Sequence, residues 1–292
     1  MRAKVRNCLR KGAIAVLRNV VFPARYRVFT WVESIVGQVP GTSIVKLRGG
    51  GKLIVDGIVD APILYMAEHD WRVRRFLCKT ARSGHTVFDL GANIGVYTIP
   101  MALRVGKGGH VYAFEAFRPN YEILLQNIAL NKLTNVTPVF GVLTDKSGAC
   151  LIPEIRERSQ TGSDLGNYSL AMKSASLVEV PALSLDDFVM QYGIDRVDLM
   201  KIDIEGSETK ALKGARTLFS QRRVGTVVCE FNPRWLSRMG SSAAELYEIA
   251  SEYGLDTYLL TRLARIKLIT REFCCSATAE FDAVLKPRPI LH

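Results

Sequence analysis

The stretch of sequence that decides the fold is Phe88-Asp89-Leu90-Gly91-Ala92-Asn93-Ile94-Gly95. Apolar residues over 86–90 predict a buried strand, the glycines predict a tight loop, and residues 96–104 have the pattern of a helix. In open α/β sheets, ligands bind at the carboxyl ends of the strands, where a loop of this kind lies. We therefore expect this loop to form part of a ligand site.

Strands and helices alternate over the rest of the chain. The expected strands are 110–114, 136–143, 197–202 and 224–229, and the expected helices are 119–131, 183–192, 208–220 and 243–253. This alternation is typical of a doubly wound α/β fold with a mostly parallel sheet. At the end of the chain, strands over 255–260, 266–269 and 281–285 with no helix between them predict an antiparallel hairpin. We expect one domain over residues 85–292.

The positive charge of the chain is concentrated in its first part. The formal net charge is +11, and residues 1–84 contain 16 Lys and Arg against 5 Asp and Glu, so residues 85–292 carry no net charge. This distribution excludes a uniformly basic nucleic-acid-binding core, and no nucleic-acid partner is expected. We expect residues 1–84 to form a basic extension of helix, short hairpin and helix, with the hairpin over 44–55 and its second helix over 62–81.

Residues 1–27 contain eight basic residues and no acidic one, with apolar residues at helical spacing. Two interpretations stay open: a basic amphipathic helix in peripheral contact with a membrane, or a helix that docks on the domain. No stretch without charged residues is long enough to span a membrane. The six cysteines lack metal-ligand spacing and favour a reducing compartment, so we expect a cytoplasmic protein.

The charge of the glycine loop selects between cofactors. A dinucleotide-binding loop would read G-x-G-x-x-G, whereas here Asp89 ends the strand and only Gly91 and Gly95 follow. A carboxylate would repel a diphosphate and attract an ammonium or sulfonium group, which predicts S-adenosylmethionine. Glu115 follows the next strand and suits hydrogen bonding to ribose hydroxyls.

These residues, together with later ones, resemble the FkbM family of S-adenosylmethionine-dependent methyltransferases over about 55–286. The markers are the loop at 88–98, Ala113-Phe114-Glu115-Ala116 with Pro119-Asn120, Leu183-Ser184-Leu185-Asp186-Asp187, and Leu199-Met200-Lys201-Ile202-Asp203-Ile204-Glu205-Gly206-Ser207-Glu208. The resemblance implies a seven-stranded class I methyltransferase (Rossmann-like) fold and methyl transfer, usually to an oxygen. It implies a small-molecule, glycan or lipid-linked acceptor without identifying it.

The resemblance also implies roles for individual residues. Asp89, Gly91, Asn93 and Gly95 would line the methionine end of the cofactor, and Glu115 would hold its ribose. Glu68 stands where the family often has a Tyr-Glu pair over the cofactor, but Ala67 replaces the aromatic residue here. Asp145 would face the adenine, with an ordinary turn as the alternative.

Three acidic residues are candidates for the chemistry. Asp203 follows the fourth strand and is the leading candidate for a base or an acceptor anchor, with Glu205 second. The alternative is that these acids cap the next helix, which is the interpretation we favour for Glu208. Glu230 ends the fifth strand and is expected to contact the acceptor, or to belong to a divalent-metal site; we assign no metal. Residues 162–170 have the composition of a loop over the acceptor site.

The sequence therefore predicts a methyltransferase that acts by in-line transfer to a hydroxyl. Two alternatives stay open: a nucleotide-dependent oxidoreductase on a similar sheet, and a non-catalytic module of the methyltransferase fold.

Overall fold

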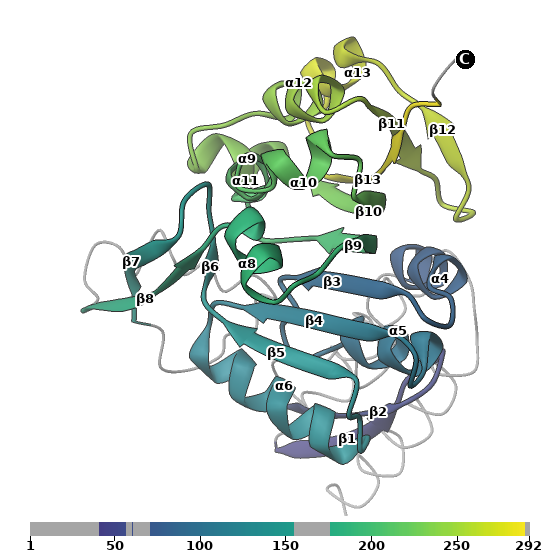
Figure 1. The fold of residues 1–292 in the computed structure, drawn as a ribbon, viewed down its shortest axis with the longest axis vertical. Coiled ribbons are helices and arrows are strands. Elements are labelled where there is room, and N and C mark those ends of the chain that lie inside the picture. The colour runs from purple at the N-terminus through teal and green to yellow at the C-terminus, as the bar shows by residue number, and fades with distance from the viewer. Residues whose placement is uncertain (1–40, 57–59, 61–70, 155–175, 290–292) are drawn as a thin grey trace, which may run out of the picture.

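The computed structural model describes residues 41–56, 60, 71–154 and 176–289, and its centre is an eight-stranded sheet (Figure 1). The strand order is β12-β11-β13-β10-β9-β3-β4-β5. Five neighbouring strands pair in parallel: β3 (Thr86–Leu90), β4 (His110–Glu115), β5 (Val136–Phe140), β9 (Val197–Ile202) and β10 (Val224–Phe231). The remaining three pair antiparallel: β11 (Leu255–Leu260), β12 (Ile266–Leu268) and β13 (Phe281–Pro287).

The predicted fold class is confirmed by this order. The first strand of the domain, β3, lies between β4 and β9, so the strand order reverses beside it. Ligands bind to doubly wound sheets at such a reversal. The sheet has a strand at each of the eight positions that the pattern predicts, one more than the seven that the resemblance implies. The prediction of no helix among the last strands is wrong, because α13 (Arg271–Ser276) lies between β12 and β13.

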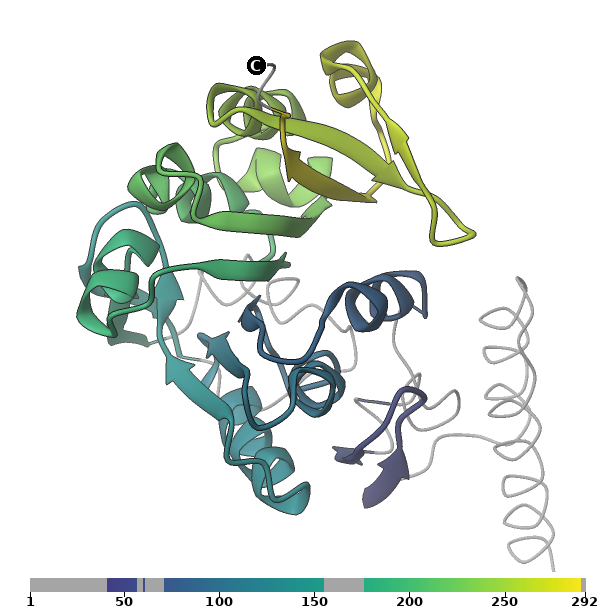
Figure 2. The same ribbon diagram turned by 45° about the vertical axis from the view of Figure 1, so that its right-hand side comes forward.

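Helices cover both faces of the sheet (Figure 2). One face packs against α4 (Trp71–Thr80) and α5 (Thr98–Val105), and the other against α8 (Leu185–Gln191), α9 (Glu208–Lys213), α10 (Arg216–Ser220) and α12 (Ala243–Glu252). Successive side chains of a strand point to opposite faces, so in β9 Leu199 packs with the first group and Met200 with the second. Both residues are fully buried, as expected for a central parallel strand.

The glycine-turn hairpin predicted near residues 44–55 is confirmed as β1 (Thr42–Lys46) and β2 (Lys52–Asp56). It packs on α6 (Arg118–Leu130), and asparagine side chains bind it there. Asn127 Oδ1 accepts a hydrogen bond from the backbone N–H of Ile54 (2.6 Å), and Asn131 Oδ1 accepts one from Lys52 (2.8 Å). The hairpin is therefore tied to the helical layer of the main sheet.

Two predicted elements are divided in the structure. The strand expected over 136–143 splits at Gly141 into β5 and β6 (Val142–Leu143), and β6 joins β8 (Leu177–Leu183) and β7 (Gly148–Pro153) in a separate sheet. The helix expected over 208–220 ends at Gly214, where a Cβ atom would lie 2.1 Å from the carbonyl oxygen of Thr144. Close packing of the β6–β7 connection therefore interrupts that helix.

Within the described part of the chain, none of the helices has the length and apolar character needed to cross a membrane. Residues 1–27, residues 62–70 of the helix expected over 62–81, and the loop at 162–170 lie outside the described residues, whereas the second half of that helix is confirmed as α4.

Candidate functional site

The loop after β3 brings the ends of two strands together. Gly91 has a φ of +81°, and a Cβ atom there would lie 1.9 Å from the carbonyl oxygen of Asp203. The backbone N–H of Asp203 also donates to the carbonyl oxygen of Leu90 (3.1 Å). Glycine is required at position 91 because the end of β9 packs against it.

Asn93 and Glu115 connect the loop to the end of β4. The two carboxylate oxygens of Glu115 accept hydrogen bonds from the backbone N–H groups of Asn93 (2.7 Å) and Phe117 (2.8 Å). Each oxygen has a second lone pair and can accept a further hydrogen bond. Asn93 Oδ1 is buried with no hydrogen-bond partner among the described residues. The loop therefore offers acceptor atoms to a ligand that carries hydrogen-bond donors. Gly95 follows at the end of the same loop, also with a positive φ.

Asp89 is completely buried below the loop. Thr98 Oγ1 donates to its Oδ2 (2.6 Å), and the ammonium group of Lys201 lies 3.8 Å from its Oδ1. Burial raises the pKa of Asp89, and Lys201 and Thr98 oppose this shift. The carboxylate is thus compensated inside the protein, so it does not select a cationic ligand in the direct way that the sequence analysis supposes. Its assignment to the cofactor site stays a prediction.

Lys201 is the centre of this charge network. Its side chain is buried, its Nζ atom lies 3.1 Å from Asp203 Oδ2, and it donates to the carbonyl oxygen of Gly91 (3.2 Å). The same atom stands 4.7 Å from the ring centroid of Tyr97, a cation–π distance. Burial lowers the pKa of Lys201, but Asp203 and Asp89 outweigh it and the net shift is upward. Lys201 therefore stays charged and links the glycine loop to the end of β9.

A polar cavity of about 220 Å³ opens beside Lys201. It is lined by residues of α4, β9, β10 and β13 and by Tyr97, and these include two of the predicted catalytic residues, Asp203 and Glu230. The Asp203 side chain is 34% exposed. At the rim, the Arg72 guanidinium pairs with Asp282 (3.3 Å). The structure thus brings Asp203 and Glu230 together in one cavity at the carboxyl ends of neighbouring parallel strands, as the topology predicts.

The carboxyl group of Glu230 has an unusual environment. Burial raises its pKa well above the ordinary value, and the negative charges of Asp203, Glu205 and Glu208 raise it further. At neutral pH Glu230 is therefore protonated, and a neutral carboxyl group can donate a hydrogen bond as well as accept one.

The turn between β9 and α9 is held by Glu208. Its Oε1 accepts hydrogen bonds from the backbone N–H groups of Ile204 and Gly206, both at 3.1 Å. Burial raises the pKa of Glu208 to about 7. Glu208 lies in the first turn of α9, and its side chain binds backbone N–H groups of the turn that precedes the helix, so it has the structural role at the helix start that we favour for it. Glu205 lies in this turn with a left-handed φ of 54°, and it is not among the cavity-lining residues.

The other predicted residues lie apart from this cavity or outside the described residues. Asp145 is exposed in the turn between β6 and β7, where its Oδ1 accepts a hydrogen bond from Thr144 (3.0 Å). Its assignment to adenine stays a prediction. Glu68 is outside the described residues. Within the described ranges, no three His, Cys, Asp or Glu side chains are grouped so that they could hold a metal ion.

Lys201 is a site residue to which we assign no role from the sequence alone, although it lies within the motif over 199–208. The available signal was a lysine inside the apolar run of 197–202, because lysine is almost never fully buried unless it is paired. Its two carboxylate partners, 3.8 Å and 3.1 Å away, belong to Asp89 and Asp203. A buried lysine in a central strand thus points to a carboxylate on a neighbouring strand.

Comparison with known proteins relates this chain to methyltransferases. The profile of the family described as "Methyltransferase FkbM domain" matches residues 89–256, more than half of the chain. Methyltransferase sdnD of Sordaria araneosa is 28% identical over 159 residues, which is 44% of this chain and 59% of that protein. The match therefore spans less than two thirds of the length of that relative.

Two further relatives differ in how much of each chain they match. Hexuronic acid methyltransferase AglP of Haloferax volcanii is 20% identical over 257 residues, covering 82% of this chain and 92% of that protein. A tRNA(Phe) (4-demethylwyosine(37)-C(7)) aminocarboxypropyltransferase of Methanocaldococcus jannaschii is 39% identical over 68 residues, which is 23% of this chain and 27% of that protein.

Proposed function

This chain belongs to the FkbM methyltransferase family, and on that premise we propose that it transfers a methyl group from S-adenosylmethionine to a hydroxyl oxygen of its acceptor. The observation that carries the proposal is the position of Asp203 and Glu230 in one cavity, which Lys201 connects to the loop after β3. Membership of a methyltransferase family favours this function over the oxidoreductase alternative.

The residues of the loop fit the proposed cofactor. Asn93 Oδ1 is a buried acceptor without a partner among the described residues, and it suits the amino group of the methionine end. Glu115, at the end of β4 beside the loop, has a carboxylate that suits hydrogen bonding to the ribose hydroxyls. When bound, S-adenosylmethionine supplies a methyl carbon that its sulfonium charge activates for attack.

The side chains of the cavity would position the acceptor and receive its proton. Lys201 holds the carboxylate of Asp203 at 3.1 Å, which fixes the group that we assign as base or anchor. Glu230 is protonated at neutral pH and would donate a hydrogen bond to the acceptor. Glu205 would act through charge, because it raises the pKa of Glu230.

For the acceptor, we propose a sugar, lipid-linked or natural-product hydroxyl. The support is the similarity to AglP, a hexuronic acid methyltransferase, which covers 82% of this chain. Residues 85–292 carry no net charge, and this does not favour a nucleic-acid partner, which would bind a basic surface.

The test combines calorimetry with labelling. Wild type and Asp203→Asn are titrated with S-adenosylmethionine and then incubated with cell-extract fractions and the cofactor labelled in its methyl group. We expect both to bind the cofactor, and labelling by the variant to fall by about 10²- to 10⁴-fold, because a positioned base contributes that much. Asp195→Asn, on the exposed surface, is the matched control and keeps full activity.

Three outcomes would contradict the proposal. Equal labelling by Asp203→Asn and wild type would remove Asp203 from the chemistry. Cofactor binding by wild type without labelling in any fraction would favour the non-catalytic module. A product whose mass shows transfer of an aminocarboxypropyl group would replace methyl transfer with the reaction in the name of the Methanocaldococcus jannaschii relative.

We also propose that this protein is cytoplasmic and touches anionic membranes through residues 1–27, which contain eight basic residues and no acidic one. Deleting these residues should lower binding to anionic liposomes and leave the affinity for S-adenosylmethionine unchanged. Equal liposome binding by the full and the shortened chain would instead support docking of this segment on the domain.

A further inference from the structure

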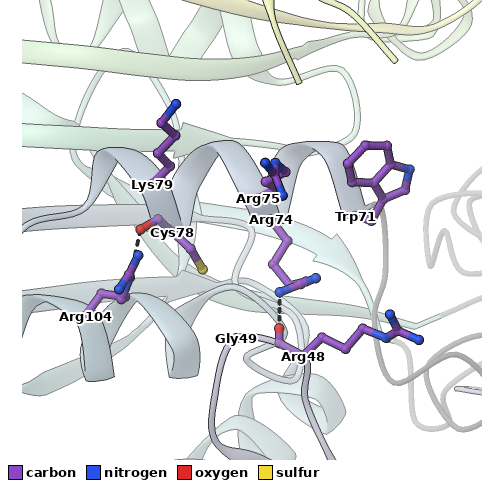
Figure 3. A pocket seen from close by; sticks show the side chains of 8 residues that line it. All are labelled: Arg48, Gly49, Trp71, Arg74, Arg75, Cys78, Lys79 and Arg104. Carbon is purple, nitrogen blue, oxygen red and sulfur yellow. Dashed lines mark hydrogen bonds between the residues drawn. The ribbon is translucent and has the colours of Figure 1, made fainter. Parts of the chain in front are cut away.

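A second cavity, of about 580 Å³, lies along α4 (Figure 3). Its lining includes five cationic side chains and one large aromatic one: Arg48, Trp71, Arg74, Arg75, Lys79 and Arg104. Three separate elements supply the cations, namely the turn between β1 and β2, helix α4 and helix α5. Segments that are separated in the sequence thus form this basic pocket together.

Among the residues that the structure describes, no acidic side chain lines the basic pocket. Within the described residues, no carboxylate oxygen lies within 4.0 Å of the charged atoms of Arg75, Lys79 or Arg104, although other surface cations such as Lys213 and Arg271 are paired. Arg75, Lys79 and Arg104 therefore present positive charge that no described carboxylate pairs, and such charge on a concave surface attracts anions because the low-dielectric walls focus its field.

Two of the guanidinium groups are held in place by the backbone. Arg104 donates through Nε to the carbonyl oxygen of Cys78 (2.9 Å), and its two terminal nitrogens have no hydrogen-bond partner among the described residues. Arg74 donates through Nη1 to the carbonyl oxygen of Arg48, as Figure 3 shows. A guanidinium fork that is already oriented loses little entropy when it binds two oxygens of an anion.

We propose that the basic pocket binds the phosphate or diphosphate group of a small ligand. The fork of an arginine guanidinium matches the geometry of phosphate oxygens. Several cations in one pocket also favour a ligand with more than one negative charge over a ligand with a single carboxylate. The volume of the pocket is in the range of about 300–1,000 Å³ that is typical of small-molecule sites. Trp71 supplies an aromatic face for the uncharged part of the ligand.

The test is calorimetric titration of the full chain with inorganic pyrophosphate at low salt. We expect one site per chain. In the double variant Arg104→Gln/Lys79→Gln the affinity should fall by at least about tenfold, because charge-assisted hydrogen bonds are lost. The matched control is Arg262→Gln/Lys267→Gln, which removes two exposed cations from the β11–β12 hairpin and should bind as wild type does. Both variants should keep their melting temperature and their affinity for S-adenosylmethionine.

Several results would overturn the proposal. One is absence of pyrophosphate binding by wild type, and another is equal weakening in the two double variants, which would reflect net charge alone. A third arm uses vesicles that contain phosphatidylglycerol: if only vesicle binding depends on Arg104 and Lys79, the pocket contacts a lipid surface and the small-ligand proposal fails. None of these outcomes depends on methyl transfer, so the proposed enzymatic function is tested separately.

Discussion

The two cavities that share α4 as a wall differ in how their charges are balanced. In the polar cavity, acidic and basic side chains lie together: Lys201 lies between Asp89 and Asp203, Arg72 pairs with Asp282, and Glu230 and Glu280 also line the cavity. Among the described residues, the lining of the basic pocket contains five cations and no acidic side chain, and Arg75, Lys79 and Arg104 have no carboxylate partner. Ion pairs between side chains of the chain hold reacting groups in position. Cations that line a pocket together can instead bind an anionic ligand. The difference indicates that the polar cavity fixes the positions of its side chains and that the basic pocket attracts an anion.

The strongest challenge to this comparison is Lys201→Met. Lys201 is 3% exposed, and its loss leaves Asp89, fully buried, without its cation. The Asp89 carboxyl must then stay charged in an apolar site or take up a proton, and either change destabilises the folded state. We expect the free energy of unfolding in urea to fall by about 3–5 kcal/mol, the usual cost of breaking a buried ion pair.

The double variant Lys201→Met/Asp89→Asn is the control for this prediction. The Asn side chain needs no counter-charge, so the double variant should recover part of the stability that Lys201→Met loses. If both variants lose the same free energy, the cost comes from packing around position 201. Charge balance in the polar cavity would then not be the reason for the buried lysine.

A second test concerns the turn that follows Asp203, where Glu208 makes the stability of the folded chain depend on pH. Its pKa is raised from 4.5 to about 7 in the folded chain, so the folded state binds this proton more tightly than the unfolded state does. This contribution to stability is therefore complete below pH 4.5 and is lost as the pH rises to about 7. The loss is on the order of 3 kcal/mol.

Glu208→Gln replaces the carboxyl group by a neutral amide of the same shape, whose oxygen can still accept from Ile204 and Gly206. The free energy of unfolding of wild type minus that of the variant should therefore decrease between pH 4.5 and 7 and stay constant above. A difference that does not change with pH would show that Glu208 does not titrate in this window.

The fold and part of the site could be predicted because they depend on local patterns. Apolar runs mark β3 and β9, and parallel topology places residues that follow neighbouring strands, such as Asp203 and Glu230, at one edge of the sheet. The separate sheet of β6, β8 and β7 was missed because its pairing joins segments far apart in the sequence. The break between α9 and α10 depends on the approach of Thr144 to Gly214, which no local pattern reveals.

The charge pairing of Asp89 could not be predicted from the glycine loop alone. A strand-end carboxylate attracts a cation, and the sequence analysis assigned that cation to the ligand. In the structure the nearest cation is Lys201, on the adjacent parallel strand, where Asp89 and Lys201 are register partners. A ligand and a buried side chain have the same effect on a carboxylate, so the sequence of the loop alone does not reveal that Lys201 is a partner of Asp89.

The smallest expected effect on the free energy of unfolding is that of a substitution in the basic pocket. Lys79→Met makes the same substitution as Lys201→Met, but Lys79 is exposed and has no carboxylate partner among the described residues. Arg75 repels it from one helical turn away, whereas the carboxyl end of α4 attracts it, and these two contributions are small and opposite. The free energy of unfolding should therefore change by less than about 0.5 kcal/mol.

Lys213→Met, which removes an exposed lysine paired with Glu245 at 2.8 Å, is the matched control and should cost up to about 1 kcal/mol. A loss well above that for Lys79→Met would mean that the folded chain itself balances the charge of the basic pocket, and the contrast between the two cavities would then be wrong.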